Sequence, residues 1–202
     1  RAISHRGESW SKCKDTISTS HRIIMAKLKI NGGKKLLGSI SCSGAKNAAL
    51  PMLAATILSD KPITFKNLPY LQDITTMFEI LGSMGADITL NESMDFIIST
   101  SQLHDYEARY ELVKTMRASI LVLGSLVARH GFARIALPGG CAIGTRPVDF
   151  HLDALEKLGA KIELKNGDIE ATSKKLIGCD INFIGVSVTG QDNIITAAVL
   201  AQ

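Results

Sequence analysis

The chain has 202 residues, of which 46% are hydrophobic and 21% charged, and its net charge is +4. This is the composition of a globular protein that can bury one or two cores. Lysines and arginines are scattered, with no run longer than a pair, and aromatic residues make up only 5%, so nucleic-acid binding is not expected. The sequence holds no apolar stretch near the roughly 20 residues of a membrane span, so no membrane contact is expected.

The four cysteines show neither the pattern of a metal site nor that of a disulfide scaffold. Cys13, Cys42, Cys141 and Cys179 form no C-x-x-C pair and no zinc-type cluster with histidine. A chain of this size and apolar content does not need disulfides for stability. We therefore expect a reduced, cytoplasmic protein without a metal.

Residues 1–24 are basic and rich in serine, and they show no apolar periodicity. Two interpretations stay open: a non-native or translated upstream leader, or an organelle transit peptide, which has the same composition. The first segment with a regular pattern opens at Met25, and the fold prediction starts there.

From Met25 onward the apolar pattern predicts alternating strands and helices. Pro51 is expected near the first turn of the first helix, where its missing N–H costs little, and Gly85 ends the second helix. The strands are expected over residues 27–30, 37–43, 61–68, 88–90 and 96–98, and the helices over residues 48–58 and 70–84.

The same order of elements follows in the second half of the chain. The turn Asn166-Gly167 is a strong hairpin signal, and Gly159 is placed to end a helix. The pattern predicts a helix over residues 112–128, a strand over 132–137, a helix over 150–158, and strands over 161–164 and 168–171.

This order reflects an internal repeat. Residues 81–88 match residues 155–162 at an offset of 74, and Leu68-Pro69 matches Leu137-Pro138 at an offset of 69. The difference of five residues (74 − 69 = 5) places an insertion in the loop after Pro138. Insertions on a repeated scaffold tend to be functional.

A third unit begins near the end of the chain. Residues 41–47 resemble residues 187–193 at an offset of 146, and a helix is expected over residues 193–202. Each unit consists of strand, helix, strand, helix and two strands. Three such units predict an α/β domain of pseudo-threefold symmetry, with helices inside and sheets outside, whose third unit lacks its later elements.

The loop of residues 137–149 carries the chemistry. Its three glycines and two prolines exclude a helix or strand. Cys141 follows Gly140 and precedes Arg146 by five residues, and glycines let backbone N–H groups approach an anion closely. Reactive thiols lie in such exposed, electropositive surroundings. The alternative is that Cys141 is an inert, small apolar residue.

Three motifs in order, residues 43–51, 113–120 and 137–151, carry a resemblance to a known family. From about residue 25 to residue 202 the sequence resembles the UDP-N-acetylglucosamine 1-carboxyvinyltransferases, the enolpyruvyl transferases that open peptidoglycan synthesis. Relatives in the shikimate pathway share the repeat fold but lack the cysteine loop. The resemblance implies repeated βαβαββ units in an inside-out α/β barrel-like domain, truncated in the third unit.

The family has two such domains in a chain about twice as long, and this chain resembles the first half. By resemblance, residues 25–43 supply N-terminal strands, the first of which belongs to the family's second domain. Residues 44–202 correspond to the first domain, incomplete at its C-terminus. The second domain is therefore an expected partner.

The resemblance also implies a reaction. Enolpyruvyl is transferred from phosphoenolpyruvate to the 3-hydroxyl of UDP-N-acetylglucosamine, with release of phosphate. The family uses no metal or organic cofactor, and its catalytic base is an Asp of the second domain. The alternative is a truncated, non-catalytic half that binds the UDP-sugar or another anion without turnover.

Site residues follow from the same resemblance. Cys141 matches the general acid that protonates the methylene carbon of phosphoenolpyruvate. The chain departs from the family at Gly185, where many relatives have a contacting lysine. The residues that match substrate contacts are Lys46, Asn47, Arg117, Arg146, Pro147, Val148, Asp149, Phe150, Ser187 and Val188.

Plainer interpretations of these residues stay open. Lys46 stands at a predicted helix start, where phosphate is favoured, but a lone lysine is usually solvated. Arg117 either binds an anion or extends from its helix to solvent. Asp149 is either a nucleotide contact or a helix N-cap, and His151 is expected to be structural.

Overall fold

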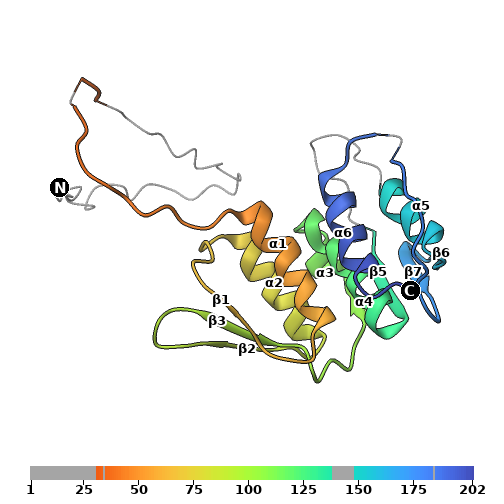
Figure 1. Cartoon of the computed structure of the whole chain (residues 1–202). Helices are drawn as coiled ribbons and strands as arrows, with labels where there is room; N and C mark the ends of the chain where they lie inside the picture. The colour runs from red at the N-terminus through yellow and green to blue at the C-terminus, as the bar shows by residue number, and fades with distance from the viewer. Residues whose placement is uncertain (1–30, 34, 138–147, 184) are drawn as a thin grey trace, which may run out of the picture. The chain divides into compact units, whose positions relative to one another are not determined.

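The computed structural model describes residues 31–33, 35–137, 148–183 and 185–202 (Figure 1). It divides into two units, Arg1–Ile40 and Ser41–Gln202. In the first unit the described residues are exposed and form no helix or strand. The helices and strands below all belong to the second unit.

The second unit alternates helices and strands in the predicted order. Its elements are α1 (Lys46–Ala55), the 3-10 helix η1 (Thr56–Leu58), β1 (Ile63–Phe65), α2 (Gln72–Ser83), β2 (Asp87–Leu90), β3 (Phe96–Ser99), β4 (Glu107–Ala108), α3 (Tyr110–Val113), the 3-10 helix η2 (Arg117–Leu121), α4 (Val122–His130), β5 (Phe132–Ala136), α5 (Asp149–Lys157), β6 (Lys161–Lys165), β7 (Asp168–Thr172) and α6 (Val188–Ala198). Within the described ranges, no helix combines the length and the apolar character needed to cross a membrane.

The strands form two separate sheets, and their order confirms the repeat. The first sheet has the order β1-β3-β2, and the second has the order β4-β5-β7-β6, so β5-β7-β6 reproduces the arrangement of the first sheet. The pairs are antiparallel except for β4 with β5, which are parallel. Gly85 and Gly159 end the second helix of each unit with φ of 102° and 92°, as predicted.

The hairpin β6–β7 confirms the Asn166-Gly167 turn. Lys165 pairs with Asp168, so the turn has two residues, and both have positive φ, 54° at Asn166 and 89° at Gly167. This is the geometry that Asn-Gly favours in a tight hairpin. Along β5 and β7 alternate residues are buried, which leaves Arg134 and Glu170 on the face away from the core.

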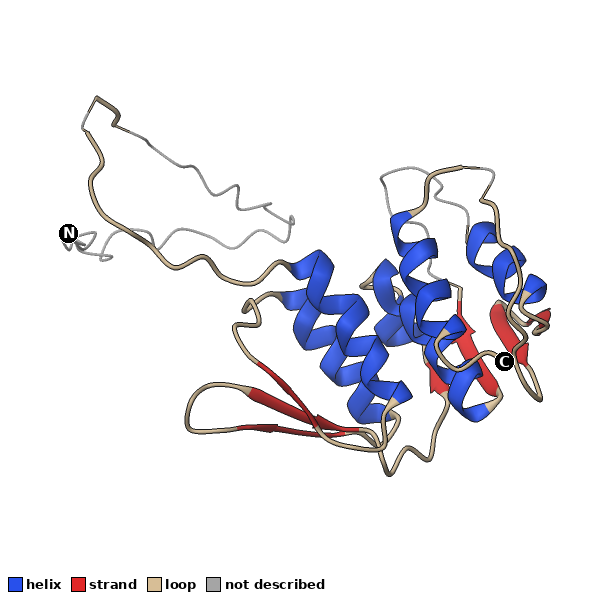
Figure 2. Cartoon of the chain, viewed as in Figure 1, coloured by secondary structure: helices blue, strands red, loops and turns tan. Residues whose placement is uncertain are grey.

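The first helices of the three units meet in the centre. α1, α4 and α6 contact one another; α2 packs on α1 and also contacts β2, and α5 packs on α6 and also contacts β6 (Figure 2). All six residues from Val122 to Val127 of α4 are buried, as expected for a helix enclosed by its neighbours. The helices are therefore inside and the sheets outside, as the repeat predicts.

Two element predictions are wrong, and the helix expected over residues 193–202 is displaced toward the N-terminus, as α6 (Val188–Ala198). The strand expected over residues 37–43 does not form, and these residues are exposed. Near its end, Gly44 N–H donates to the carbonyl of Asn67 at 3.1 Å, and Nδ2 of Asn67 donates to the carbonyl of Cys42 at 3.3 Å. Asn67 has φ of 58°, a left-handed conformation that a continuous strand ladder does not tolerate.

The single helix expected over residues 112–128 is instead α3, η2 and α4. Met116 is extended, with φ of −145° and ψ of 113°, so the helix is interrupted there and Arg117 starts a new element. Pro51 is the sixth residue of α1, which is beyond the first turn where it was expected. Because proline has no N–H, the carbonyl of Asn47 accepts no helical hydrogen bond from it.

β4 was not predicted, because two residues are too few to show a period.

Candidate functional site

The helices of the candidate site run in the same direction. Lys46 and Asp73 pair at the starts of α1 and α2, and His151 contacts Thr189 in the first turns of α5 and α6. At the C-terminal ends of α1 and α4, Arg129 in the last turn of α4 donates to the carbonyl of Ile57, which lies just after α1, at 2.7 Å. The starts of α1, α2, α5 and α6 therefore face the same way (Figure 1). Helix N-termini present unpaired N–H groups and a positive dipole end, which favour anions.

Lys46 and Asn47 are the first two residues of α1, as predicted. The side chain of Lys46 is 41% exposed, and its Nζ lies 2.6 Å from Oδ2 of Asp73. Asn47 is exposed. Lys46 is therefore neither fully solvated nor unpaired, and an anion that binds it must compete with the carboxylate of Asp73. The acidic residue in the first turn of α2 was a signal that could have predicted this partner.

Arg117 is half-buried at the start of η2 and does not lie inside a continuous helix. Three candidate residues, Cys141, Arg146 and Pro147, lie outside the residues that the structure describes. Their roles stay predictions.

The start of α5 contradicts one alternative for Asp149. Val148 occupies the N-cap position without a side-chain hydrogen bond, and Asp149 is the first residue of the helix and is exposed. Asp149 is therefore not an N-cap. Phe150 packs edge-on against Phe183, with ring centroids 6.3 Å apart.

The start of α6 lies next to that of α5. A Cβ atom at Gly185 would lie 3.2 Å from Cζ of Phe150. A larger residue at this position would therefore require the ring of Phe150 to shift slightly. Ser187 is the N-cap of α6, and its Oγ accepts the N–H of Gly190 at 3.1 Å. Val188 follows it and is exposed. The structure thus brings two of the predicted nucleotide-contacting segments together.

Sequence reasoning missed a buried cluster behind these helix starts. His151 accepts a hydrogen bond at Nδ1 from Nδ2 of Asn193, at 3.0 Å, and Oδ1 of Asn193 accepts the N–H of Gly124 at 2.8 Å. Burial lowers the pKa of His151 to about 4, so it is neutral and structural, as expected. The pairing of residues 151 and 193 leaves no signal in a single sequence.

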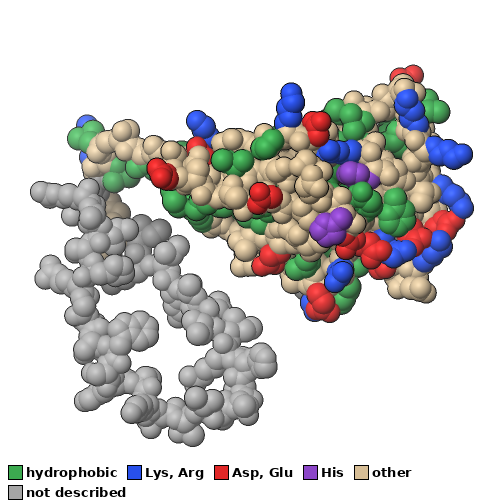
Figure 3. Space-filling view, turned by 90° about the horizontal axis from the view of Figure 1, so that it is seen from below, with side chains coloured by type: hydrophobic (Ala, Val, Ile, Leu, Met, Phe, Trp, Pro, Cys, Tyr) green, Lys and Arg blue, Asp and Glu red, His purple; other side chains and the backbone are tan. Residues whose placement is uncertain are grey.

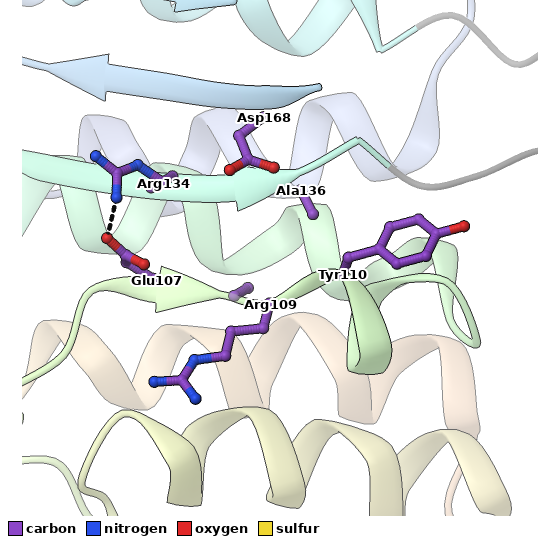
Figure 4. A pocket seen from close by; sticks show the side chains of 7 residues that line it. Glu107, Arg109, Tyr110, Arg134, Ala136 and Asp168 are labelled. Carbon is purple, nitrogen blue, oxygen red and sulfur yellow. Dashed lines mark hydrogen bonds and ion pairs between the residues drawn. The ribbon is translucent and has the colours of Figure 1, made fainter. Parts of the chain in front are cut away.

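A shallow pocket of about 190 Å³ lies at the second sheet, and no predicted site residue lines it. Figure 4 shows Glu107 on β4 facing Arg134 on β5. Arg134 also contacts Glu170, with Nη2 2.6 Å from Oε1. Lys165 and Arg134 lower the pKa of Glu170. The walls of this pocket are thus an ion-paired sheet surface.

Charge pairing of this kind continues across the sheet. Hydrogen bonds from Lys161 and Lys165 lower the pKa of Glu163 to about 2. On the face shown in Figure 3, acidic and basic side chains are likewise interspersed. Among the described residues, no three His, Cys, Asp or Glu side chains are grouped to hold a metal.

Comparison with known proteins supports the resemblance. The family model described as EPSP synthase (3-phosphoshikimate 1-carboxyvinyltransferase) matches residues 30–202. The chain belongs to this family. Enolpyruvyl transferase NikO from Streptomyces tendae has a similar fold, with a TM-score of 0.68 and 21% identity over 84% of this chain and 40% of that one. EPSP synthase from Acinetobacter baumannii matches with a TM-score of 0.65 and 17% identity, over 82% and 38%. These family structures confirm the fold class.

Curated relatives within the family are more similar in sequence. UDP-N-acetylglucosamine 1-carboxyvinyltransferase from Coxiella burnetii is 55% identical over 179 residues, which are 88% of this chain and 41% of the relative. The protein of the same name from Halorhodospira halophila is 52% identical over 178 residues, or 88% and 43%. The chain therefore spans about two fifths of the length of these relatives.

Proposed function

We propose that this chain supplies one domain of an enzyme that transfers enolpyruvyl from phosphoenolpyruvate to the 3-hydroxyl of UDP-N-acetylglucosamine and releases phosphate. The observation that carries the proposal is the 55% identity over 179 residues to a protein named for this activity. On this proposal the chain acts in peptidoglycan synthesis, and hence in cell shape and division, in the cytoplasm.

Cys141 is the proposed general acid. Its thiol gives a proton to C3 of phosphoenolpyruvate, and C2 becomes an oxocarbenium-like centre. The sugar 3-hydroxyl attacks C2 and loses its proton to a base, the second domain's Asp by resemblance. Loss of a C3 proton and cleavage of the C2–O bond to phosphate then yield the enolpyruvyl ether and inorganic phosphate. The proton balance closes, because the C3 proton returns to the Cys141 thiolate and the hydroxyl proton taken by the base passes to the released phosphate.

Cationic groups hold the anionic parts of both substrates in this proposal. Lys46, Arg117 and Arg146 provide charge, and Asn47 provides an amide beside them. Preorganised charge of this kind is usually the largest catalytic contribution. The parallel helix starts support the assignment, since their N–H groups and dipoles add to the same positive end.

The UDP part is assigned to the paired starts of α5 and α6. Pro147, Val148, Asp149 and Phe150 form one proposed contact segment, and Ser187 with Val188 forms the other. The contact of Phe150 with Phe183 and its closeness to Gly185 support this, because they hold the segments side by side.

Calorimetry tests the binding half of the proposal. The 202-residue chain is titrated with UDP-N-acetylglucosamine, and UDP and inorganic phosphate serve as controls. We expect measurable binding of the UDP-sugar that exceeds binding of phosphate. Equal, weak binding of all three would indicate a general anion site and contradict the proposal.

A second candidate is a non-catalytic half that binds the UDP-sugar without turnover. This candidate concerns the 202 residues by themselves, which span 41% of the relative. Phosphate release is measured with the chain alone and with a supplied second domain from a relative. Release only with the second domain supports the transferase, and binding without release in both mixtures supports the non-catalytic half.

A further inference from the structure

A buried hydrogen-bonded chain joins the first turn of α5 to α4 through the middle of α6. Asn193 in α6 is fully buried, and His151 in α5 is 3% exposed. Asn193 connects His151 to the N–H of Gly124, the third residue of α4. That N–H lies just after the point where η2 passes into α4. A side chain of α6 thus binds the backbone of α4 directly.

The hydrogen-bond directions in this cluster are determined. A backbone N–H can only donate, so the atom that Asn193 turns toward Gly124 must be its amide oxygen. Its NH₂ group therefore faces Nδ1 of His151, which must accept. The imidazole then carries its proton on Nε2, which lies 3.5 Å from Oγ1 of Thr189. With the proton on Nδ1 instead, two donors, the Nδ1–H group and the NH₂ group of Asn193, would face each other.

The backbone of α4 is shaped to admit Asn193. A Cβ atom at Gly124 would lie 2.4 Å from the backbone oxygen of Asn193 and 2.5 Å from its Oδ1. Such distances do not occur in real structures, so only glycine allows this approach of α4 and α6. The residues at positions 124, 151 and 193 therefore fit one another, both in the space that they leave and in the hydrogen bonds that they make.

We propose that Asn193 and His151 are positioning residues for UDP-sugar binding. They do not contact the ligand in this proposal. They hold the start of α5, with Asp149 and Phe150, at a fixed spacing from the start of α6, with Ser187. The inference rests on the proposed function, because it assigns these two helix starts to the nucleotide.

The first experiment needs no variant. Long-range ¹H–¹⁵N NMR of the histidine side chains distinguishes the two neutral tautomers. We expect one histidine to be fixed in the Nε2–H form at neutral pH, and His151→Phe identifies it by loss of its signal. A His151 signal of the Nδ1–H form, or an average of the two tautomers, would overturn the proposal.

The second experiment separates positioning from stability. Asn193→Leu removes both hydrogen bonds at similar volume. The matched control is Thr100→Val, because Thr100 Oγ1 is also buried and donates toward the carbonyls of Thr56 and Ser59, at 2.7 and 3.0 Å, beyond the other end of α1. We expect both variants to lower the unfolding temperature and only Asn193→Leu to weaken UDP-N-acetylglucosamine binding, by about tenfold or more.

A conservative variant provides the rescue. Asn193→Asp keeps an acceptor for Gly124 and places a second acceptor against His151. We expect the imidazole to move its proton to Nδ1 and the UDP-sugar affinity to stay within about threefold of the unaltered chain. His151→Phe, which keeps the bond from Asn193 to Gly124, serves where Asn193→Leu does not fold.

The outcomes distinguish this inference from the proposed function. Absence of binding by the unaltered chain would overturn the proposed function and this inference with it. Binding by the unaltered chain and equally by folded Asn193→Leu or His151→Phe would overturn the positioning role alone.

Discussion

Lys46 at the start of α1 places its Nζ 2.6 Å from Oδ2 of Asp73 in the first turn of α2. The pair joins two helix N-termini, where a positive dipole end already favours an anion. In the proposed site a substrate phosphate or carboxylate takes the place of Asp73 as the partner of Lys46.

Removing the charge of Lys46 is expected to weaken anion binding, and removing the charge of Asp73 is expected to strengthen it. Lys46→Ala removes a charge-assisted hydrogen bond worth roughly 1.5–3 kcal/mol, so UDP-N-acetylglucosamine or phosphoenolpyruvate should bind about 10- to 150-fold more weakly. Asp73→Asn removes the competing charge and is expected to strengthen binding a few-fold. Calorimetry on each variant measures both effects.

Lys157→Ala is the matched control for Lys46→Ala. Its side chain is equally exposed, at 41%, and pairs with Asp153 at 2.9 Å, but it lies at the end of α5. We expect its loss to leave ligand affinity unchanged. Equal affinities in Lys46→Ala and Lys157→Ala would contradict the placement of the anion at α1.

Gly124→Ala tests the close approach of α4 to α6. The added methyl would lie within 2.5 Å of two oxygen atoms of Asn193, and overpacking of this kind costs about 1–3 kcal/mol. Gly82→Ala in α2 is the control, because nothing lies within 4 Å of its Cβ position. We expect thermal unfolding to show a loss of stability for Gly124→Ala and a gain of about 0.5–1 kcal/mol for Gly82→Ala.

The buried imidazole of His151 is expected to make stability depend on pH. Its pKa falls from 6.5 to about 4 on burial, next to the uncharged Asn193 and Thr189. Below pH 6.5 the unfolded chain therefore binds more protons than the folded chain. The stabilising contribution is complete above pH 6.5 and is lost as pH falls toward 4, by roughly 3 kcal/mol.

Denaturant unfolding of the unaltered chain and of His151→Phe isolates this contribution from the carboxylates that titrate nearby. At neutral pH the variant is expected to be less stable, because it leaves the amide of Asn193 unpaired. The difference should shrink between pH 6.5 and pH 4. His104→Gln is the control for an exposed histidine, and a difference independent of pH for His151→Phe would refute the prediction.

The proposed acid Cys141 is expected to react with an epoxide phosphonate of the fosfomycin type once a second domain is supplied. Cys42 and Cys179 are exposed free thiols and serve as internal controls. Peptide mass mapping should find label on Cys141 far above the other cysteines. Uniform labelling would argue against a special thiol, and Cys141→Asp should abolish labelling while keeping some phosphate release, since a carboxylic acid also donates a proton.

Local patterns predicted most of the elements, and the repeat predicted that the helices lie inside and the sheets outside. The Asn166-Gly167 turn, the glycines that end α2 and α5, and the helices over residues 70–84 and 150–158 each depend on neighbours in the chain. Predictions were wrong where distant contacts decide. Residues 37–43 are exposed and form no strand, and the helix at 112–128 is interrupted at Met116.

The candidate site divides in the same way. The motifs placed Lys46 and Asn47 at a helix start, because glycine and capping signals are local. The helix that follows Ser187 was expected only from residue 193 and begins at Val188. The partner of Lys46 and the contact of Phe150 with Phe183 depend on helices that meet only in the folded chain.

Asn47 and Asn193 show the division most clearly. The sequence alone determines that they are counterparts in the repeat, since their numbers differ by the offset of 146 (193 − 47 = 146). Yet Asn47 is exposed and Asn193 is fully buried. α6 begins at Val188, whose counterpart is residue 42 (188 − 146 = 42), four residues before α1 begins at Lys46. The tertiary structure alone decides their roles, because only Asn193 meets a glycine in a neighbouring helix that leaves room for its amide.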